Sequence, residues 1–137
     1  MSYLKEFVIS VHSFIKFSIN TIGFKKTVDN LHYKIIPNMA LKKRNISNKK
    51  INDIYNSLSN LSFSGDIVGS CLSFSLAVHF ILVSFGCGNS KMQIGVRVID
   101  GKFFSHSWVI YNGKVIGKQF GNIDYLVIKE IDLSKTL

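Results

Sequence analysis

Two residues far apart in the sequence have the types and the settings that nucleophilic catalysis needs. Cys71 follows Gly69-Ser70 at the predicted start of an apolar helix, where unpaired backbone N–H groups and the helix dipole lower the pKa of a thiol. His106 lies in the middle of a predicted strand. If this strand packs beside the helix start, the imidazole can take the thiol proton as a general base and return a proton to a leaving amine. The pair therefore points to acyl chemistry by a cysteine nucleophile.

The same residues also fit a structural role. Free cysteine is among the most buried residue types, and a histidine in a strand is an ordinary sheet residue. Cys87, at the predicted end of the apolar helix, and His79, two turns into it, are interpreted as structural. Two cysteines and four histidines without metal-ligand spacing predict no zinc site.

The hydrophobic spacing predicts helices first and strands afterwards. Before residue 90, apolar residues recur at helical intervals. After it, they alternate as in strands. The predicted helices cover residues 3–20, 21–36, 51–61 and 71–85, and the predicted strands cover residues 92–99, 103–111, 114–118 and 125–131. This order predicts an α+β fold, with N-terminal helices and a central cysteine-bearing helix packed on a small antiparallel sheet.

Length and composition predict one domain. The chain has 137 residues, 47% of them hydrophobic and 18% charged, which excludes a disordered protein. Within this domain we expect a basic helical part over residues 1–61 and a catalytic core over residues 62–137. The uncharged stretch over residues 67–90 contains several serines and a histidine, so it is interpreted as a buried helix rather than a membrane span.

The charge is concentrated in the first part of the chain. Residues 1–50 carry ten basic residues against two acidic ones, whereas residues 51–137 carry seven against six. This asymmetry indicates either a solvated face or an acidic partner, and it allows peripheral membrane contact through the basic half. Aromatic residues are not interleaved with the basic run, so no nucleic-acid partner is expected. The N-terminus lacks the pattern of a signal peptide, which predicts a cytoplasmic protein.

One part of the sequence resembles a known family. The segments CLSFSLAVHFILVSFG from Cys71, IGVRV from Ile94 and FFSHSWVIYNGKVIG around His106 resemble the cysteine-protease domain of lasso-peptide maturation, the B-protein leader peptidase that processes microcin-type precursors. The resemblance covers about residues 60–137. It implies a papain-related, transglutaminase-like core and a Cys-His-Asp triad in which Cys71 is the nucleophile and His106 the histidine. It also implies three partners: a precursor leader peptide, a separate leader-recognition protein and a lasso cyclase. Hydrolysis itself needs no cofactor.

The acidic member of the triad does not carry over from the family. Its position falls on Lys118, and a lysine beside His106 would disfavour the imidazolium. A two-residue hairpin loop would instead place Gln119 opposite His106, where its side-chain carbonyl can orient the ring. A three-residue loop with a bulge places Lys118 there, and the family position favours this bulged form. Asp100 and Asp124 are further acidic candidates from loops.

Two functions of different classes follow. The first is a cysteine peptidase that cuts the leader peptide from a ribosomally made lasso-type precursor, with Cys71, His106 and Gln119 as the site. The second is a catalytically degenerate homologue that binds a peptide, a protein or a membrane. In the second reading, the missing acid reflects a real loss of catalysis.

Overall fold

The N-terminal part of the chain forms the predicted helices. The computed structural model describes residues 2–39, 45–62, 70–116 and 125–134. The four α-helices are α1 (Ser2–Ile22), α2 (Phe24–Asn30), α3 (Asn48–Ser62) and α4 (Ser70–Ser84). Gly23, with φ of 91°, separates α1 from α2 in a backbone conformation that favours glycine. A π-turn over Leu31–Ile35 and a 3-10 turn over Ile36–Asn38, which contains Pro37, then end the helical run.

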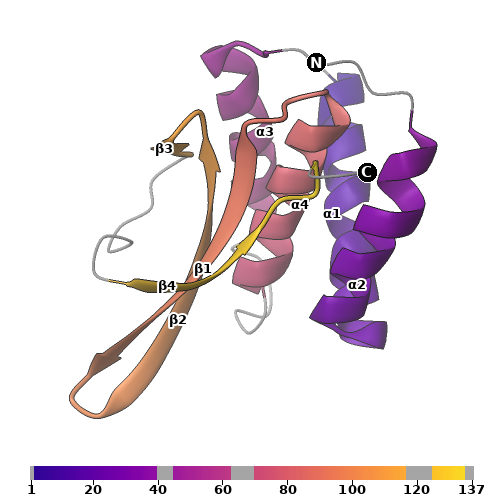
Figure 1. Ribbon diagram of the computed structural model, residues 1–137. Helices are drawn as coiled ribbons and strands as arrows, with labels where there is room; N and C mark the ends of the chain where they lie inside the picture. The colour runs from indigo at the N-terminus through magenta and orange to yellow at the C-terminus, as the bar shows by residue number, and fades with distance from the viewer. Residues whose placement is uncertain (1, 40–44, 63–69, 117–124, 135–137) are drawn as a thin grey trace.

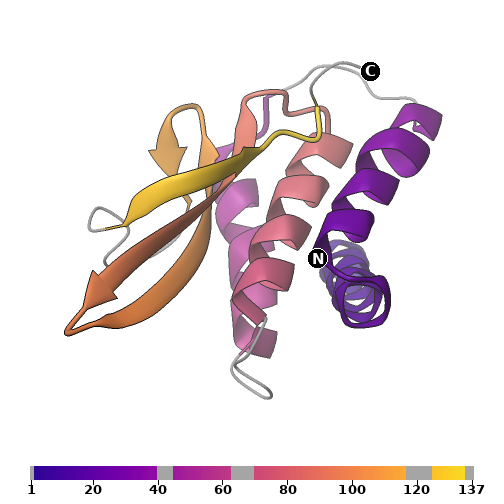
Figure 2. The same cartoon turned by 60° about the horizontal axis from the view of Figure 1, so that its bottom comes forward.

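Helix α4 is the centre of the core. It lies between the sheet on one side and α1 and α2 on the other, and both views show this layering (Figures 1 and 2). The side chains from Leu76 to Val83 are all buried, which fits a helix that is apolar on every side. Val8 and Ile15 of α1 and Ile54 of α3 complete this core. None of the helices in the described ranges has the length and apolar character that a bilayer crossing requires.

Four antiparallel strands form the second layer. They are β1 (Ser90–Ile99), β2 (Lys102–Tyr111), β3 (Lys114–Val115) and β4 (Leu126–Ile131), in the spatial order β3-β2-β1-β4. The last strand therefore crosses over to pair with β1 rather than with β3. Helices packed on an antiparallel sheet confirm the predicted α+β class.

Both hairpins turn through two residues with positive φ. These are Asp100-Gly101, at 51° and 78°, and Asn112-Gly113, at 53° and 81°, as in type I′ turns. Tyr111 pairs with Lys114 across the second turn. Of the two hairpin forms expected, the two-residue loop is therefore the one observed and the bulged form is not, because the Asn-Gly turn supports both positive φ values without an extra residue. The described third strand also ends at Val115, earlier than expected.

Candidate active site

The structure brings Cys71 and His106 together. Cys71 is the second residue of α4, and His106 lies in the middle of β2. The Cys71 Sγ atom is 3.4 Å from His106 Nδ1. This contact joins residues 35 positions apart in the sequence, as a nucleophile and its general base require.

The thiol also lies against the backbone of β2. Ile116 N–H donates to Val109 O at 2.9 Å, so the polar backbone groups of Val109 face the β3 side of the strand. The backbone groups of Ser107, two residues earlier, face the same side. There Ser107 N–H donates to Cys71 Sγ at 3.2 Å, and Ser107 O lies 3.7 Å from the sulfur. The thiol thus occupies the edge of β2 beyond the short pairing with β3.

The Ser107 side chain makes further contacts with Cys71. Its Oγ atom is 3.0 Å from Cys71 Sγ and 2.9 Å from the Cys71 carbonyl oxygen. The hydroxyl oxygen of Ser75, one turn further along α4, lies 3.0 Å from Ser107 Oγ. Ser75 is buried like Ser107, so this part of the helix–sheet interface contains polar side chains, whereas the buried Ser73 faces His12 of α1.

These contacts make the thiol more acidic. Burial raises the pKa of Cys71, but the hydrogen bonds from His106 and Ser107 and the proximity of the imidazole lower it by more, so the pKa lies below its ordinary value. A thiolate is the reactive form of cysteine. The local geometry therefore favours the form that attacks a carbonyl carbon.

Aromatic rings surround His106 on the other face of the sheet. Its ring centroid lies 5.7 Å from that of Trp108 and 5.6 Å from that of Tyr125, and the Arg97 guanidinium lies 4.9 Å above the Tyr125 ring. Gly95 pairs with His106 across β1 and β2. A Cβ atom at Gly95 would come within 2.7 Å of Trp108 Cη2 and 2.8 Å of Tyr125 Cβ, so only glycine allows this packing.

Trp108 is buried on the face of the sheet that carries His106, rather than lining an open groove. Only 2% of its surface is exposed, and its Nε1–H donates to Gln93 Oε1 at 2.9 Å. A tryptophan on this strand could either line a substrate groove or pack in the interior, and the burial of Trp108 supports packing.

Of the four positions considered for the third member of the site, only Asp100 lies within the described residues. Lys118, Gln119 and Asp124 lie outside the described residues. Asp100 is exposed in the β1–β2 turn, five positions from the residue that pairs with His106. At about 3.4 Å per residue, this separation is roughly 17 Å, too far for a hydrogen bond. The hairpin register, extended by counting, would place Gln119 opposite His106, but ladder pairing there would need the Ser107 N–H that donates to Cys71 Sγ, so the role of Gln119 stays a prediction.

The remaining cysteine and histidines have structural surroundings. Cys87 is 1% exposed. His79 is fully buried and hydrogen-bonded to Ser90 Oγ at 2.7 Å and to Leu133 N–H at 3.0 Å. His12 lies 3.4 Å from Ser73 Oγ. No group of three or more metal-ligating side chains was found within the described ranges.

The sequence comparison agrees with this arrangement. The model of the transglutaminase-like superfamily matches residues 21–128. The chain therefore belongs to the transglutaminase-like superfamily, and the matched range includes Cys71, His106 and Ser107. Neither the curated proteins nor the solved structures gave a match.

Sequence reasoning did not identify Ser107 as part of the site. It noted the serine only as a neighbour of His106, because alternation in a strand directs the two side chains to opposite faces. The contact arises because the sulfur lies at the strand edge, where it reaches His106 and Ser107 together. A serine next to the histidine, on the strand face that also carries Val109 and Tyr111, was the available signal.

Proposed function

We propose that this protein is a cysteine peptidase that removes the leader peptide from a ribosomally synthesised lasso-type precursor. The observation that carries the peptidase chemistry is the 3.4 Å contact between Cys71 Sγ and His106 Nδ1 at the first turn of α4. The substrate class is supported by the resemblance of residues 60–137 to lasso leader peptidases. Membership of the transglutaminase-like superfamily supports acyl transfer through a cysteine, and leaves the acceptor to experiment.

The reaction follows from the arrangement of these two side chains. The Cys71 thiol proton moves to His106 Nδ1, and the thiolate attacks the carbonyl carbon at the end of the leader. The N–H of Cys71, in the first turn of α4, is a donor for the oxyanion. His106 gives its proton to the departing amine, which leaves a thioester on Cys71. His106 then takes a proton from water, whose oxygen forms the new carboxylate as the thioester breaks.

Three partners belong to this proposal. They are the leader peptide as substrate, a separate leader-recognition protein and a lasso cyclase that uses the product. The basic residues of the N-terminal half favour an acidic face on whichever partner they contact. We also propose that the protein acts in the cytoplasm, because a ribosomally made precursor is synthesised in the cytoplasm and would be cut there before export.

The decisive experiment incubates the protein with a candidate precursor, with and without its leader-binding partner, and identifies products by mass spectrometry. We expect one cut at the leader end and complete loss of the product in Cys71→Ala. Cys87→Ala is the matched control, because Cys87 is the second free cysteine and lies beyond the end of α4, away from His106. Cleavage by Cys71→Ala would refute the assignment. An amide-linked product in place of a free carboxylate would identify transfer to an amine.

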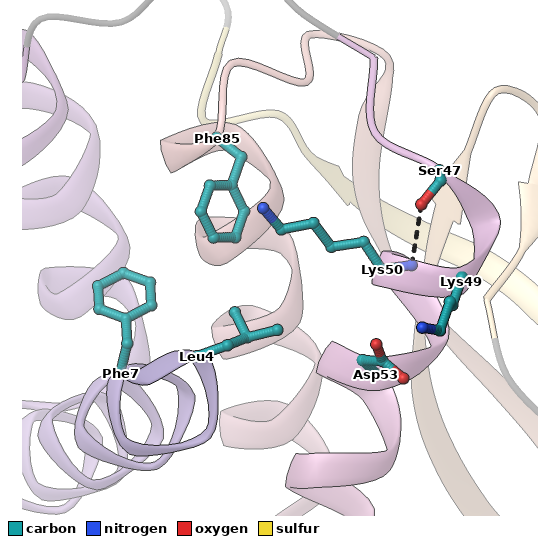
Figure 3. A pocket seen from close by; sticks show the side chains of 7 residues that line it. All are labelled: Leu4, Phe7, Ser47, Lys49, Lys50, Asp53 and Phe85. Carbon is teal, nitrogen blue, oxygen red and sulfur yellow. Dashed lines mark hydrogen bonds between the residues drawn. The ribbon is translucent and has the colours of Figure 1, made fainter. Parts of the chain in front are cut away.

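A cavity at the other end of α4 favours a second candidate function, the binding of a peptide without catalysis. It has a volume of about 480 Å³, and Figure 3 shows side chains from α1, from the start of α3 and from the end of α4 around it. Leu4, Phe7 and Phe85 supply apolar surface. Lys49 and Lys50 supply two positive charges against the one negative charge of Asp53.

This cavity fits a peptide with a bulky apolar side chain close to a carboxylate. The Lys50 Nζ atom lies 4.4 Å above the Phe85 ring, so cation and aromatic surface face the same space (Figure 3). Along α4 the cavity is roughly 20 Å from Cys71, too far for a ligand side chain to serve both sites. A degenerate homologue would bind such a peptide or an anionic vesicle while Cys71 reacts as an ordinary thiol.

Thiol reactivity separates the two functions. An activated Cys71 reacts with iodoacetamide at pH 6, where an ordinary thiol does not. Peptide binding is measured by fluorescence anisotropy for Lys50→Glu, with Lys25→Glu as a control of equal charge change on an exposed part of α2. Slow alkylation together with binding that Lys50→Glu alone weakens would favour the binding module.

A further inference from the structure

The Ser107 hydroxyl has more neighbours than it has protons. Three atoms lie within 3.0 Å of its Oγ: Cys71 Sγ, the Cys71 carbonyl oxygen and Ser75 Oγ. A serine hydroxyl carries one proton and two lone pairs, so it donates to one of the three at a time. The side chain is 2% exposed, so water does not compete freely for this proton.

The charge on Cys71 decides which neighbour receives the proton. While Cys71 is a neutral thiol, its sulfur is a weak acceptor, and the Cys71 carbonyl oxygen at 2.9 Å is the better one. Once the thiol proton has moved to His106, the sulfur is an anion and attracts the hydroxyl more strongly than a carbonyl does. The Ser107 O–H can also donate to Ser75 Oγ at 3.0 Å, so Ser75 is a second neutral acceptor with which the sulfur anion competes.

We propose that Ser107 holds the nucleophile of the proposed reaction, with its fixed N–H and its rotating O–H both donating to the Cys71 thiolate. This inference rests on the proposed cysteine chemistry and adds a residue to it. The N–H is in place before the reaction, because the edge of β2 directs it at the sulfur at 3.2 Å. The hydroxyl turns from the Cys71 carbonyl to the sulfur as the thiol proton leaves. No atom is gained or lost in this turn.

Such support makes the thiolate less dependent on the residue that orients His106. In a triad, the third member stabilises the imidazolium of the ion pair. Two donors from Ser107 stabilise the other half of the same pair, the sulfur anion. A site whose family acid is replaced by Lys118 can therefore keep a reactive cysteine.

The test measures the rate at which iodoacetamide alkylates Cys71 from pH 5 to pH 10, with peptide mass spectrometry to separate Cys71 from Cys87. In Ser107→Ala we expect the midpoint to rise by about one pH unit, so that the rate at pH 6 falls about tenfold. The limiting rate at pH 10 should not change, because every thiol is then ionised. Ser107→Thr, which retains the hydroxyl, should restore most of the rate at pH 6.

Ser105→Ala is the matched control. Ser105 lies two residues earlier on the same strand and points to the same face, but it is exposed and has no contact with the sulfur among the described hydrogen bonds. Its profile should equal that of the unchanged protein. A Ser107→Ala midpoint equal to that of Ser105→Ala would overturn the proposal. An equal loss at pH 6 and pH 10 would also overturn it, because it would indicate structural damage alone.

A measurement on the unchanged protein covers the case in which Ser107→Ala does not fold. The amide proton resonance of Ser107 should shift downfield with the same midpoint as the alkylation rate, whereas that of Ser105 should stay constant. A Ser107 amide that ignores Cys71 ionisation would overturn the proposal. If alkylation of the unchanged protein shows an ordinary thiol midpoint, the cysteine chemistry itself fails. A low midpoint without precursor cleavage overturns the leader substrate and supports the role of Ser107.

Discussion

Two histidines, one on the central helix α4 and one in contact with its first turn, differ in whether their ring nitrogens can exchange a proton. His79, on α4, is fully buried and bonded at both ring nitrogens. Its Nε2 atom accepts from Leu133 N–H, so its proton is on Nδ1 and is donated to Ser90 Oγ. His106, on β2, directs Nδ1 at a thiol, whose proton can move. One histidine has a fixed tautomer, and the other faces a group that can exchange a proton with it.

The difference teaches that burial and catalysis make opposite demands on an imidazole. Burial lowers the pKa of His79 to about 4, although Asp132 opposes the shift, so this ring stays neutral near pH 7. A general base must accept and return a proton near the working pH, which requires an environment that tolerates the cation. His106 is only partly buried and lies among aromatic rings, whose faces can stabilise such a charge.

The largest expected effect comes from replacing each of these histidines in turn and measuring precursor cleavage. His106→Ala should lower precursor cleavage by about 10³-fold or more, because it removes both the general base and the cationic partner of the thiolate. His79→Gln should retain cleavage wherever the protein remains folded, since His79 touches none of the reacting atoms. Mass spectrometry of timed samples measures both rates. Equal losses in the two variants would remove the distinction drawn between them.

Features that depend on residues close together in the sequence could be predicted from it, and contacts between distant segments could be predicted only in part. The four helices and both Asx-Gly turns follow from local spacing and from residues that tolerate positive φ. His79 was correctly interpreted as a core residue, because it lies on the buried face of an apolar helix. Such features depend on neighbours a few positions away, so a sequence pattern is enough to find them.

Contacts between distant segments were only partly predictable. The meeting of Cys71 with His106 was expected from the chemistry each residue type allows and from the family resemblance. The place of β4 beside β1, which brings Tyr125 to His106, was not expected. Neither was the contact of the thiol with Ser107, which depends on how helix α4 meets the strand edge. Strand order and docking angle are set by packing across the whole domain, and no local pattern encodes them.

The pH dependence of the free energy of unfolding tests whether His79 is held neutral in the folded protein. Because the folded-state pKa of about 4 lies below the ordinary value of 6.5, the unfolded chain binds more protons between these values. The stabilising effect of neutral His79 is thus complete above pH 6.5 and is lost as the pH falls toward 4. We expect urea unfolding to show about 2 kcal/mol less stability at pH 5 than at pH 7.5.

His79→Gln supplies the control for this titration. Burial, with help from Lys16, also lowers the pKa of His12, so some acid sensitivity should remain in the variant. The difference between the two slopes reports His79 alone. Identical slopes for the variant and the unchanged protein would show that His79 is not the group that titrates.

Gly95→Ala should produce a smaller effect that reaches both stability and His106. The new methyl group would meet Trp108 Cη2 at 2.7 Å and Tyr125 Cβ at 2.8 Å, and a Cβ atom moves only with its backbone. We expect about 1–3 kcal/mol lower stability in urea unfolding, and slower cleavage because the same two rings pack on His106. Gly88→Ala is the control, since nothing lies within 4 Å of its added methyl group. A Gly95→Ala protein as stable as Gly88→Ala would contradict this packing.

The smallest effect is expected at Asp100, the exposed carboxylate in the β1–β2 turn. Asp100→Asn changes an exposed turn residue at φ of 51°, a conformation that asparagine also adopts readily. Stability should change by less than about 0.5 kcal/mol and cleavage by less than about twofold, because the register places the turn roughly 17 Å from His106. Gln119→Ala, measured in the same assay, should slow cleavage clearly if the Gln119 amide orients His106. A strong loss in Asp100→Asn with none in Gln119→Ala would mean that an acid from the turn, rather than an amide from the hairpin, orients the histidine.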